Sequence, residues 1–243
     1  MGDVLNGPLT GRRALVTGAT RGIGKAIAHR LQRDGATVTI TGTQPGPASS
    51  DGFVYRAVDF SDVAATRSFA DEVPAMDLDI VINNAGINAI GPFSDLAVDD
   101  FERIQRVNVH APFQICRAAV AGLRKKGWGR IVNISSIFGV ISKEFRAPYS
   151  ASKFALDGLT AALAAEVAAD GVLANCVSPG FVETDMTRRI LGDEGIAALV
   201  ARVPIRRFAQ PEEIAALVAW LAGPENTYVS GQSIVIDGGF TRV

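Results

Sequence analysis

The chain has 243 residues, 48% of them hydrophobic, with a formal net charge of −1 and an isoelectric point near 6.1. That length gives one large domain with a substantial core, and the near-neutral charge excludes an electrostatic argument for nucleic acid or an anionic membrane surface as partner. The N-terminus lacks the apolar segment of a signal peptide and no apolar run reaches ~18 residues, so we expect a cytoplasmic protein without a membrane span.

Short apolar runs bounded by turn residues predict seven strands. They lie at 12–18, 37–42, 53–60, 78–86, 129–136, 172–180 and 233–239. Helices are predicted between most of them, at 22–34, 61–73, 98–126, 150–169 and 211–222. The segment 43–52 is loop-like, although a covering helix would be expected there. Strands that alternate with helices predict an α/β fold, with a doubly wound, parallel, seven-stranded sheet flanked by helices in a single domain.

A glycine-rich turn, TGATRGIG at 17–24, follows the first strand and opens the first helix. Gly18, Gly22 and Gly24 have no Cβ where the backbone would turn tightly and approach a pyrophosphate at a helix N-terminus. A tight turn without a ligand is the alternative. The strand before the glycines and the helix after them favour a dinucleotide site.

The end of the second strand favours NADP(H) over NAD(H). A carboxylate about 20 residues past the glycines would bind the ribose hydroxyls of NAD, and residues 41–44 contain no acid. Arg21, inside the glycine-rich turn, would instead face a 2′-phosphate, with Thr43 adding a hydroxyl.

The two cysteines and two histidines predict neither a disulfide nor a metal site. Cys116 and Cys176 lie in apolar surroundings typical of reduced, buried thiols. His29 and His110 have no ligand spacing with them. The basic run from Arg124 to Arg130 is interpreted as a solvated helix C-terminus rather than a binding patch, because cations favour that end of the helix dipole.

Tyr149 and Lys153 lie four residues apart in YSASK, close to one helical turn, so they share a helix face. Alone, such a pair more often exposes two polar side chains. Here it is one of six motifs in order: TGATRGIG, NNAG at 83–86, Asn108 in RVNVHAPF, NISS at 133–136, YSASK, and SPGFVETDM at 178–186. Together they resemble the short-chain dehydrogenases/reductases of the classical type, nearest to the 3-oxoacyl-carrier-protein-reductase-like branch.

The resemblance covers nearly the whole chain, and the closing YVSGQSIVIDGGF agrees with it. It implies a Rossmann fold over 1–243, with a cofactor half at about 10–90 and a catalytic and substrate half at about 91–243. It also implies hydride transfer between a nicotinamide and the carbonyl or alcohol carbon of a substrate.

The same resemblance implies four catalytic residues. Tyr149 would act as general acid/base, with Lys153 lowering its pKa and holding the nicotinamide ribose. Ser136 would hydrogen-bond to the carbonyl oxygen, with Ser135 as the competing serine. Asn108, in the middle of a long helix, would hold a water in a proton relay.

The cofactor would contact residues of the glycine-rich turn and of the segments that follow the strands. These are Gly18, Thr20, Arg21, Gly22, Ile23, Gly24, Thr43, Asp59, Phe60, Asn84, Ala85, Gly86, Tyr149, Lys153, Pro179, Gly180, Val182 and Thr184. Asp59 would contact the adenine, with capping of the helix at 61 as its alternative role. Asn84 would pack by the ribose, and Val182 and Thr184 would lie near the carboxamide.

The substrate pocket is expected to have a mostly apolar lining, which favours a small, mostly apolar ketone or secondary alcohol. Its residues would be Asn88, Ile90, Phe138, Phe145, Phe181, Met186 and Ile190. Arg146, in the charged segment SKEFRAP, is interpreted as part of a solvated loop, and contact with an anionic substrate is the alternative.

Partners are predicted from two further features. The arginines with which the resembled branch docks an acyl carrier protein are replaced by Gly127 and Asp170, which disfavours that partner, although a 3-oxoacyl-[acyl-carrier-protein] reductase stays the alternative function. A catalytically silent nucleotide-binding scaffold is the remote alternative. The alanine-rich helix 150–169, which family members commonly pair across a two-fold axis, predicts a homotetramer.

Overall fold

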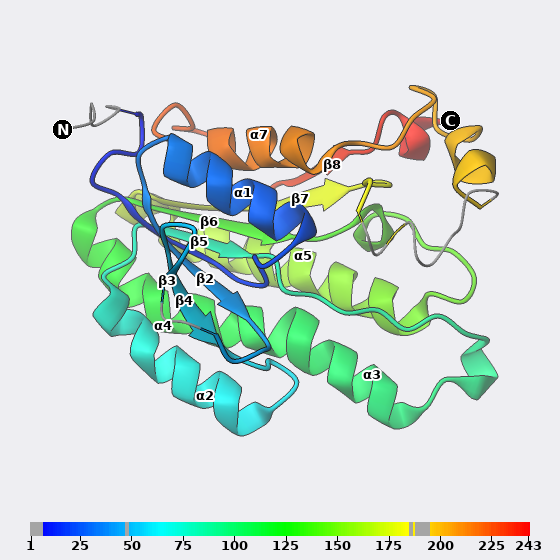
Figure 1. Cartoon of the computed structure of the whole chain (residues 1–243), viewed down its shortest axis with the longest axis horizontal. Coiled ribbons are helices and arrows are strands. Elements are labelled where there is room, and N and C mark those ends of the chain that lie inside the picture. The colour runs from blue at the N-terminus through cyan, green and yellow to red at the C-terminus, as the bar shows by residue number, and fades with distance from the viewer. Residues whose placement is uncertain (1–6, 47–48, 185–186, 188–194) are drawn as a thin grey trace.

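A computed structural model describes residues 7–46, 49–184, 187 and 195–243 of the chain. Within these residues, eight strands form one sheet in the order β3-β4-β2-β1-β5-β6-β7-β8, and helices cover both of its faces (Figure 1). No helix in these ranges combines the length and the apolar composition that a membrane crossing requires.

The seven predicted strands are confirmed, and they pair with one another in parallel. They are β1 (Arg13–Val16), β2 (Thr37–Gly42), β4 (Phe53–Ala57), β5 (Ile80–Asn83), β6 (Gly129–Ile134), β7 (Val172–Pro179) and β8 (Ser233–Ile236). The chain adds strands outward from β1 to β4, then returns to the other side of β1 with β5. This reversal places the carboxyl ends of β1 and β5 beside each other, where open α/β sheets bind ligands.

The predicted loop 43–52 contains one additional strand. β3 (Ser49–Ser50) pairs antiparallel with β4 at the sheet edge. The connection runs through Asp51 and Gly52, whose φ angles are 52° and 80°. An Asp-Gly pair with two positive φ angles is the usual connection of a tight hairpin, so the sequence held a signal for this strand.

Five of the helices lie on the two faces of the sheet. α1 (Gly22–Arg33) and α7 (Pro211–Ala222) cover one face, and α2 (Val63–Glu72), α4 (Ala111–Lys126) and α5 (Ala147–Val167) cover the other (Figure 1). The predicted helix 98–126 is continuous but not uniform, because a π-helical segment, Arg106–His110, joins α3 (Val98–Gln105) to α4.

Two apolar cores follow from the alternation of side chains along buried strands. Val16 of β1 packs with the α1 and α7 side, whereas its neighbour Leu15 packs with the α2, α4 and α5 side. In β5, Ile82 and Val81 divide in the same way. The sheet is therefore buried on both faces, as a parallel sheet requires.

A polar chain crosses the second core and connects β5 and β6 to α5. The amide of Asn83 donates a 2.8 Å hydrogen bond to Oδ1 of Asn133, whose own amide donates at 2.7 Å to Oγ1 of Thr160. Cys116 and Cys176 border this chain as buried free thiols, and burial raises the pKa of each to about 12. Both cysteines are thus unreactive core residues, as predicted.

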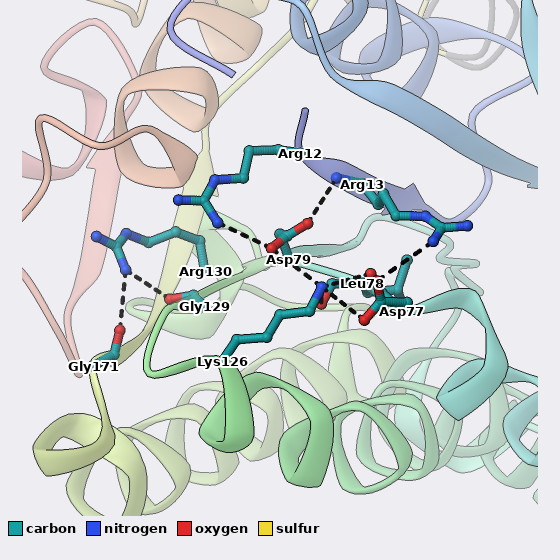
Figure 2. Close-up of polar contacts among 9 residues, drawn as sticks. All are labelled: Arg12, Arg13, Asp77, Leu78, Asp79, Lys126, Gly129, Arg130 and Gly171. Carbon is teal, nitrogen blue, oxygen red and sulfur yellow. Dashed lines mark hydrogen bonds and ion pairs between the residues drawn. The ribbon is translucent and has the colours of Figure 1, made fainter. Parts of the chain in front are cut away.

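A charged cluster ties together the amino ends of β1 and β5, with Asp79 at its centre (Figure 2). Asp79 is 4% exposed and accepts hydrogen bonds from Nη1 of Arg12 at 3.1 Å and from the backbone N–H of Arg13 at 2.9 Å. Nζ of Lys126 lies 3.3 Å from Asp79 and 3.0 Å from Asp77. The cluster therefore holds the amino ends of β1 and β5 together.

The interpretation of Arg124 to Arg130 as a solvated helix end is confirmed for Arg124, Lys125 and Lys126, which are exposed in the last turn of α4, and is wrong for Arg130. Arg124 forms a 2.6 Å ion pair with Asp170. Arg130 is only 4% exposed and donates a 2.8 Å hydrogen bond to the carbonyl of Asn226, with its guanidinium 4.5 Å from the ring centroid of Trp128. Long-range packing, which the local charge pattern does not reveal, buries this arginine.

Candidate active site

A cleft of about 600 Å³ lies at the carboxyl ends of the central strands. The charged cluster lies at the other ends of these strands. The lining of the cleft comes from the segments that directly follow β1, β2, β4, β5, β6 and β7. All of the residues predicted to contact the cofactor line this cleft. So do Ser136, Asn88, Ile90, Phe138 and Phe181 from the catalytic and substrate sets, whereas Met186 and Ile190 fall outside the described residues.

The glycine-rich turn is shaped by close backbone contacts. Gly18 has φ +62°, and a Cβ added there would lie 2.8 Å from Cα of Ala85. A Cβ on Gly24 would lie 2.6 Å from the carbonyl oxygen of Gly18. Side chains fix the turn: Oγ1 of Thr41 accepts from the Gly18 N–H at 3.0 Å, and the Asn84 amide donates to the Gly18 carbonyl at 3.0 Å.

The N-terminus of α1 lies at this cleft. Arg21 precedes the helix without making a side-chain cap, and no acidic residue lies in the first turn. Three first-turn residues, Gly22, Ile23 and Gly24, belong to the cleft lining. A helix end of this kind attracts anions, because its N–H groups are unpaired and carry the positive end of the helix dipole.

Asp59 lies in the cleft lining and does not cap the neighbouring helix. Its Oδ1 accepts hydrogen bonds from the backbone N–H and the hydroxyl of Ser61, at 2.9 and 2.8 Å. α2 begins at Val63 and is capped instead by Asp62, which accepts from the Ala64 N–H at 2.7 Å. The capping role considered for Asp59 therefore belongs to Asp62.

Tyr149 and Lys153 both enter the cleft from the first turns of α5. Nζ of Lys153 lies 5.5 Å from the ring centroid of Tyr149 and donates a 2.8 Å hydrogen bond to the carbonyl of Ile134. Burial lowers the pKa of this lysine to about 8. The pKa of Tyr149 is set here by burial, Ser136 and Arg146, so the predicted lowering of that pKa by Lys153 stays a prediction.

The two neighbouring serines have different surroundings. Ser135 is buried and donates to the carbonyl of Lys153 at 3.3 Å, so its hydroxyl is used inside the protein. Burial raises the pKa of Tyr149, while a hydrogen bond with Ser136 and the positive charge of Arg146 lower it in part. The geometry favours Ser136 over Ser135 as the serine that acts with Tyr149.

Asn108 lies behind the cleft, in the π-helical segment, and is 1% exposed. Its Oδ1 accepts from the Ile87 N–H at 2.9 Å, and its amide donates to the Ile87 carbonyl at 3.0 Å and to the hydroxyl of Ser152 at 2.9 Å. Since both amide hydrogens are used, the side chain of Asn108 fixes the segment after β5 against α5.

The substrate end of the cleft is partly different from the prediction. The structure places Phe145 outside the lining, with φ +66° and a half-exposed ring. Arg146, the next residue, lines the cleft instead, with its guanidinium 5.4 Å from the ring centroid of Phe138. The left-handed conformation of Phe145 is strained for a non-glycine residue, and such strain concentrates at functional sites.

Sequence reasoning missed several lining residues. Gly42, Ser61, Ile87 and Ile134 adjoin residues that were predicted, so the ends of the strands held a signal for them. Arg103 and Val107 are one helical turn apart, just before Asn108, which is also a usable signal. Thr187 and Leu199 line the cleft without any sequence signal. Within the described ranges, no three histidine, cysteine, aspartate or glutamate side chains are grouped as metal ligands.

Known proteins share both the sequence and the fold. Residues 18–241 match the family model described as "Enoyl-(Acyl carrier protein) reductase". The chain is 38% identical to the 3-oxoacyl-[acyl-carrier-protein] reductase of Vibrio harveyi, over 97% of this chain and 99% of the relative.

Two solved structures are similar over nearly the full length. A gluconate 5-dehydrogenase from Burkholderia cenocepacia, in complex with NADP and tartrate, has a TM-score of 0.89, 33% identity and coverage of 97% of both chains. A 3-oxoacyl (acyl-carrier-protein) reductase from Agrobacterium tumefaciens with NADP bound has a TM-score of 0.88 and 32% identity, and the match covers 95% of this chain and 94% of that one.

Proposed function

The chain belongs to the short-chain dehydrogenase/reductase family, as an NAD(P)-dependent oxidoreductase acting on CH–OH groups, and from that premise we propose that it interconverts a small, mostly apolar ketone and its secondary alcohol with NADP(H). The single observation that supports this most strongly is that Ser136, Tyr149 and Lys153 line the same cleft as the glycine-rich turn.

The residues present fit a dinucleotide. The turn at Gly18 and Gly24 has no room for a Cβ, so its backbone approaches the cleft closely, and the N-terminus of α1 faces the same space. Asn84, Asp59 and Arg21 line the cleft along the path that the adenosine half would take. When bound, the nicotinamide supplies or accepts a hydride.

Tyr149 moves the proton in this proposal. In the direction of reduction its phenol donates a proton to the carbonyl oxygen, and in the direction of oxidation its phenolate takes the proton from the alcohol. Ser136 holds the same oxygen by a hydrogen bond. Lys153 would hold the nicotinamide ribose through Nζ and would stabilise the phenolate. Asn108 positions Tyr149 indirectly, by fixing the segment after β5 against α5. We also propose that a water held beside Asn108 takes part in a proton relay.

NADP(H) is the proposed cofactor because of charge. Arg21 is exposed in the cleft, makes no ion pair with a described residue, and has no acid near it at 41–44. The structures from Burkholderia cenocepacia and Agrobacterium tumefaciens hold NADP, which supports the same choice.

A free ketone is favoured over an acyl group on a carrier protein. Arg124 pairs with Asp170 at 2.6 Å and Lys126 pairs with Asp77 at 3.0 Å, so two of the three cations in the last turn before Gly127 have acidic partners, while Lys125 is exposed. An acidic carrier would find only part of this positive charge unpaired. The 38% identity to the Vibrio harveyi reductase favours 3-oxoacyl-[acyl-carrier-protein] reductase as the second candidate.

A homotetramer is the proposed assembly. Phe113 of α4 and Phe154 of α5 are 49% and 47% exposed, and Ala151 and Ala155 are exposed beside Phe154. Large apolar rings next to small side chains suit close packing between helices of two chains. Light scattering should give about four times the chain mass of 25.5 kDa, and the mass of one chain would contradict the proposal.

The function is tested with NADPH and a panel of free ketones beside acetoacetyl carrier protein, over a salt series. We expect turnover of free ketones. A carrier-bound substrate that is preferred by about tenfold and weakens as salt rises would favour the second candidate. Binding of NADPH without turnover of any substrate would favour a silent scaffold.

A further inference from the structure

Arg146 is a cation in the cleft without a partner. It lies at the N-terminus of α5, three residues before Tyr149, and is partly buried. Its Nε is fully enclosed and without a hydrogen bond, and no described residue forms an ion pair with the guanidinium. Burial lowers the pKa of Arg146, and the neighbouring Tyr149 offsets this effect only in part.

Two other arginines of this protein have partners that compensate for the water removed from around their charge. Arg130, which is more deeply buried, donates hydrogen bonds from its terminal nitrogens to the carbonyls of Gly129 and Asn226, both at 2.8 Å, although its Nε, like that of Arg146, has no hydrogen-bond partner. Arg103, another arginine of the cleft lining, pairs with Asp100 at 3.0 Å. Arg146 has neither kind of partner. A desolvated cation is unfavourable unless an anion completes it, so the site is built for an anion.

The position of Arg146 assigns that anion to the substrate. Its guanidinium lies against the ring of Phe138, and that ring in turn lies 6.5 Å from the ring of Tyr149, centroid to centroid. The charge of Arg146 acts on the phenol directly, since it lowers the pKa of Tyr149. The anion site of the glycine-rich turn is formed by a different segment, at the N-terminus of α1.

We propose that Arg146 binds a carboxylate of the substrate, so that the enzyme interconverts a short oxo acid and the corresponding hydroxy acid. Guanidinium and carboxylate match as two parallel N–H···O hydrogen bonds, which the two terminal nitrogens of Arg146 would donate, because its Nε is enclosed by the protein. The carbonyl would then lie at Tyr149, and the apolar side chains of Ile90, Phe138 and Phe181 would surround the carbons between.

This inference rests on the proposed function and uses the same transfer of a hydride and a proton. The carbonyl carbon gains a hydride from NADPH and its oxygen gains a proton from Tyr149, while the carboxylate is unchanged. An acyl group on a carrier protein has a thioester in place of the free carboxylate. Carboxylate recognition by Arg146 therefore also separates this enzyme from carrier-dependent relatives.

The test compares short oxo acids with their methyl esters, which keep the ketone and remove the charge. For the wild type we expect kcat/KM for the acid to exceed that for the ester by about tenfold or more. R146Q should reduce this ratio to about one by lowering activity on the acid, and R146K should restore part of it. Thermal unfolding of each variant shows whether it is folded.

Lys143→Gln is the matched control. Lys143 lies in the same loop, carries the same charge, pairs with Glu144 at 3.6 Å and is not part of the cleft lining. This variant should keep the wild-type ratio of acid to ester. A folded R146Q protein that loses activity equally on acid and ester would overturn the inference, because Arg146 would then act only through Tyr149.

The two proposals fail in different ways. If the wild type reduces ketones and esters as well as it reduces oxo acids, carboxylate recognition is wrong and the proposed function stands. If NADPH reduces neither the acids nor any uncharged ketone, the proposed function itself is wrong.

Discussion

The side-chain amide of Asn108 donates a 2.9 Å hydrogen bond to the hydroxyl of Ser152. Ser152 donates in turn to the backbone carbonyl of Tyr149 at 2.7 Å. The same amide clamps the backbone of Ile87 on the other side. A π-helical segment thus joins the loop after β5 to the first turn of α5, and π-helical turns are frequent at functional sites.

Asn108→Ala should therefore affect both stability and turnover. Three hydrogen-bonding groups, the N–H and C=O of Ile87 and the hydroxyl of Ser152, lose their partner, which should cost about 1–3 kcal/mol of unfolding free energy. Turnover should fall by about tenfold or more, because the position of Tyr149 relaxes. Denaturant unfolding and steady-state kinetics measure both effects. A variant with wild-type stability and turnover would show that Asn108 does not fix these segments.

Lys153→Met tests the buried ammonium. The pKa of Lys153 is lowered to about 8 from 10.5, so between these values the unfolded chain holds a proton that the folded chain has lost. Stability of the wild type should therefore rise with pH from about 8 to about 10.5, relative to the variant. Unfolding free energies measured for both proteins across this window give the difference. A difference that is constant with pH would contradict the shifted pKa.

Cofactor choice is tested at Arg21 and Thr43. Arg21→Gln should weaken NADPH more than NADH, and Thr43→Asp should add repulsion against the 2′-phosphate. Gly42 is a poor site for the same acid, because a Cβ there would lie 2.5 Å from Cγ2 of Thr20 and 2.7 Å from the Tyr55 hydroxyl. The readout is kcat/KM with each cofactor. A wild type that already prefers NADH would refute the assignment.

Asp79→Asn tests the charged cluster of Figure 2. Arg12 and Lys126 lose the negative charge of a buried carboxylate, and because both cations are partly exposed the cost should be about 1–3 kcal/mol. The kcat should be unchanged, because the cluster lies at the amino ends of the strands and the cleft lies at their carboxyl ends. Glu102→Gln, in an exposed pair with Arg106, is the control and should cost at most about 0.5 kcal/mol. Equal losses in both variants would contradict a structural role for Asp79.

The parts of the fold that follow local patterns could be predicted. Each buried strand is an apolar run ended by a turn residue, and the cleft lining follows those strand ends, so residues such as Gly18 and Asn84 could be assigned to one edge of the sheet. The Tyr149–Lys153 pair was predictable for the same reason, because its spacing is that of a helical turn.

The parts that depend on long-range packing could not be predicted. Arg130 is buried because Trp128 and the distant Asn226 surround it, and no local pattern contains that information. The choice between Phe145 and Arg146 as the lining residue depends on one positive φ angle. The π-helical segment at Asn108 lies inside a continuous helical pattern, so periodicity alone did not reveal it.

Tyr149→Phe tests the central claim most directly, because it removes one hydroxyl from the phenol that we propose as proton donor. The measurement is single-turnover reduction of the best ketone by NADPH, with NADPH binding followed separately by titration. We expect NADPH to bind as it does to the wild type and the rate of reduction to fall by several orders of magnitude, roughly 10³-fold. A variant that binds NADPH and keeps about a tenth of the wild-type rate would contradict Tyr149 as the acid/base of this enzyme.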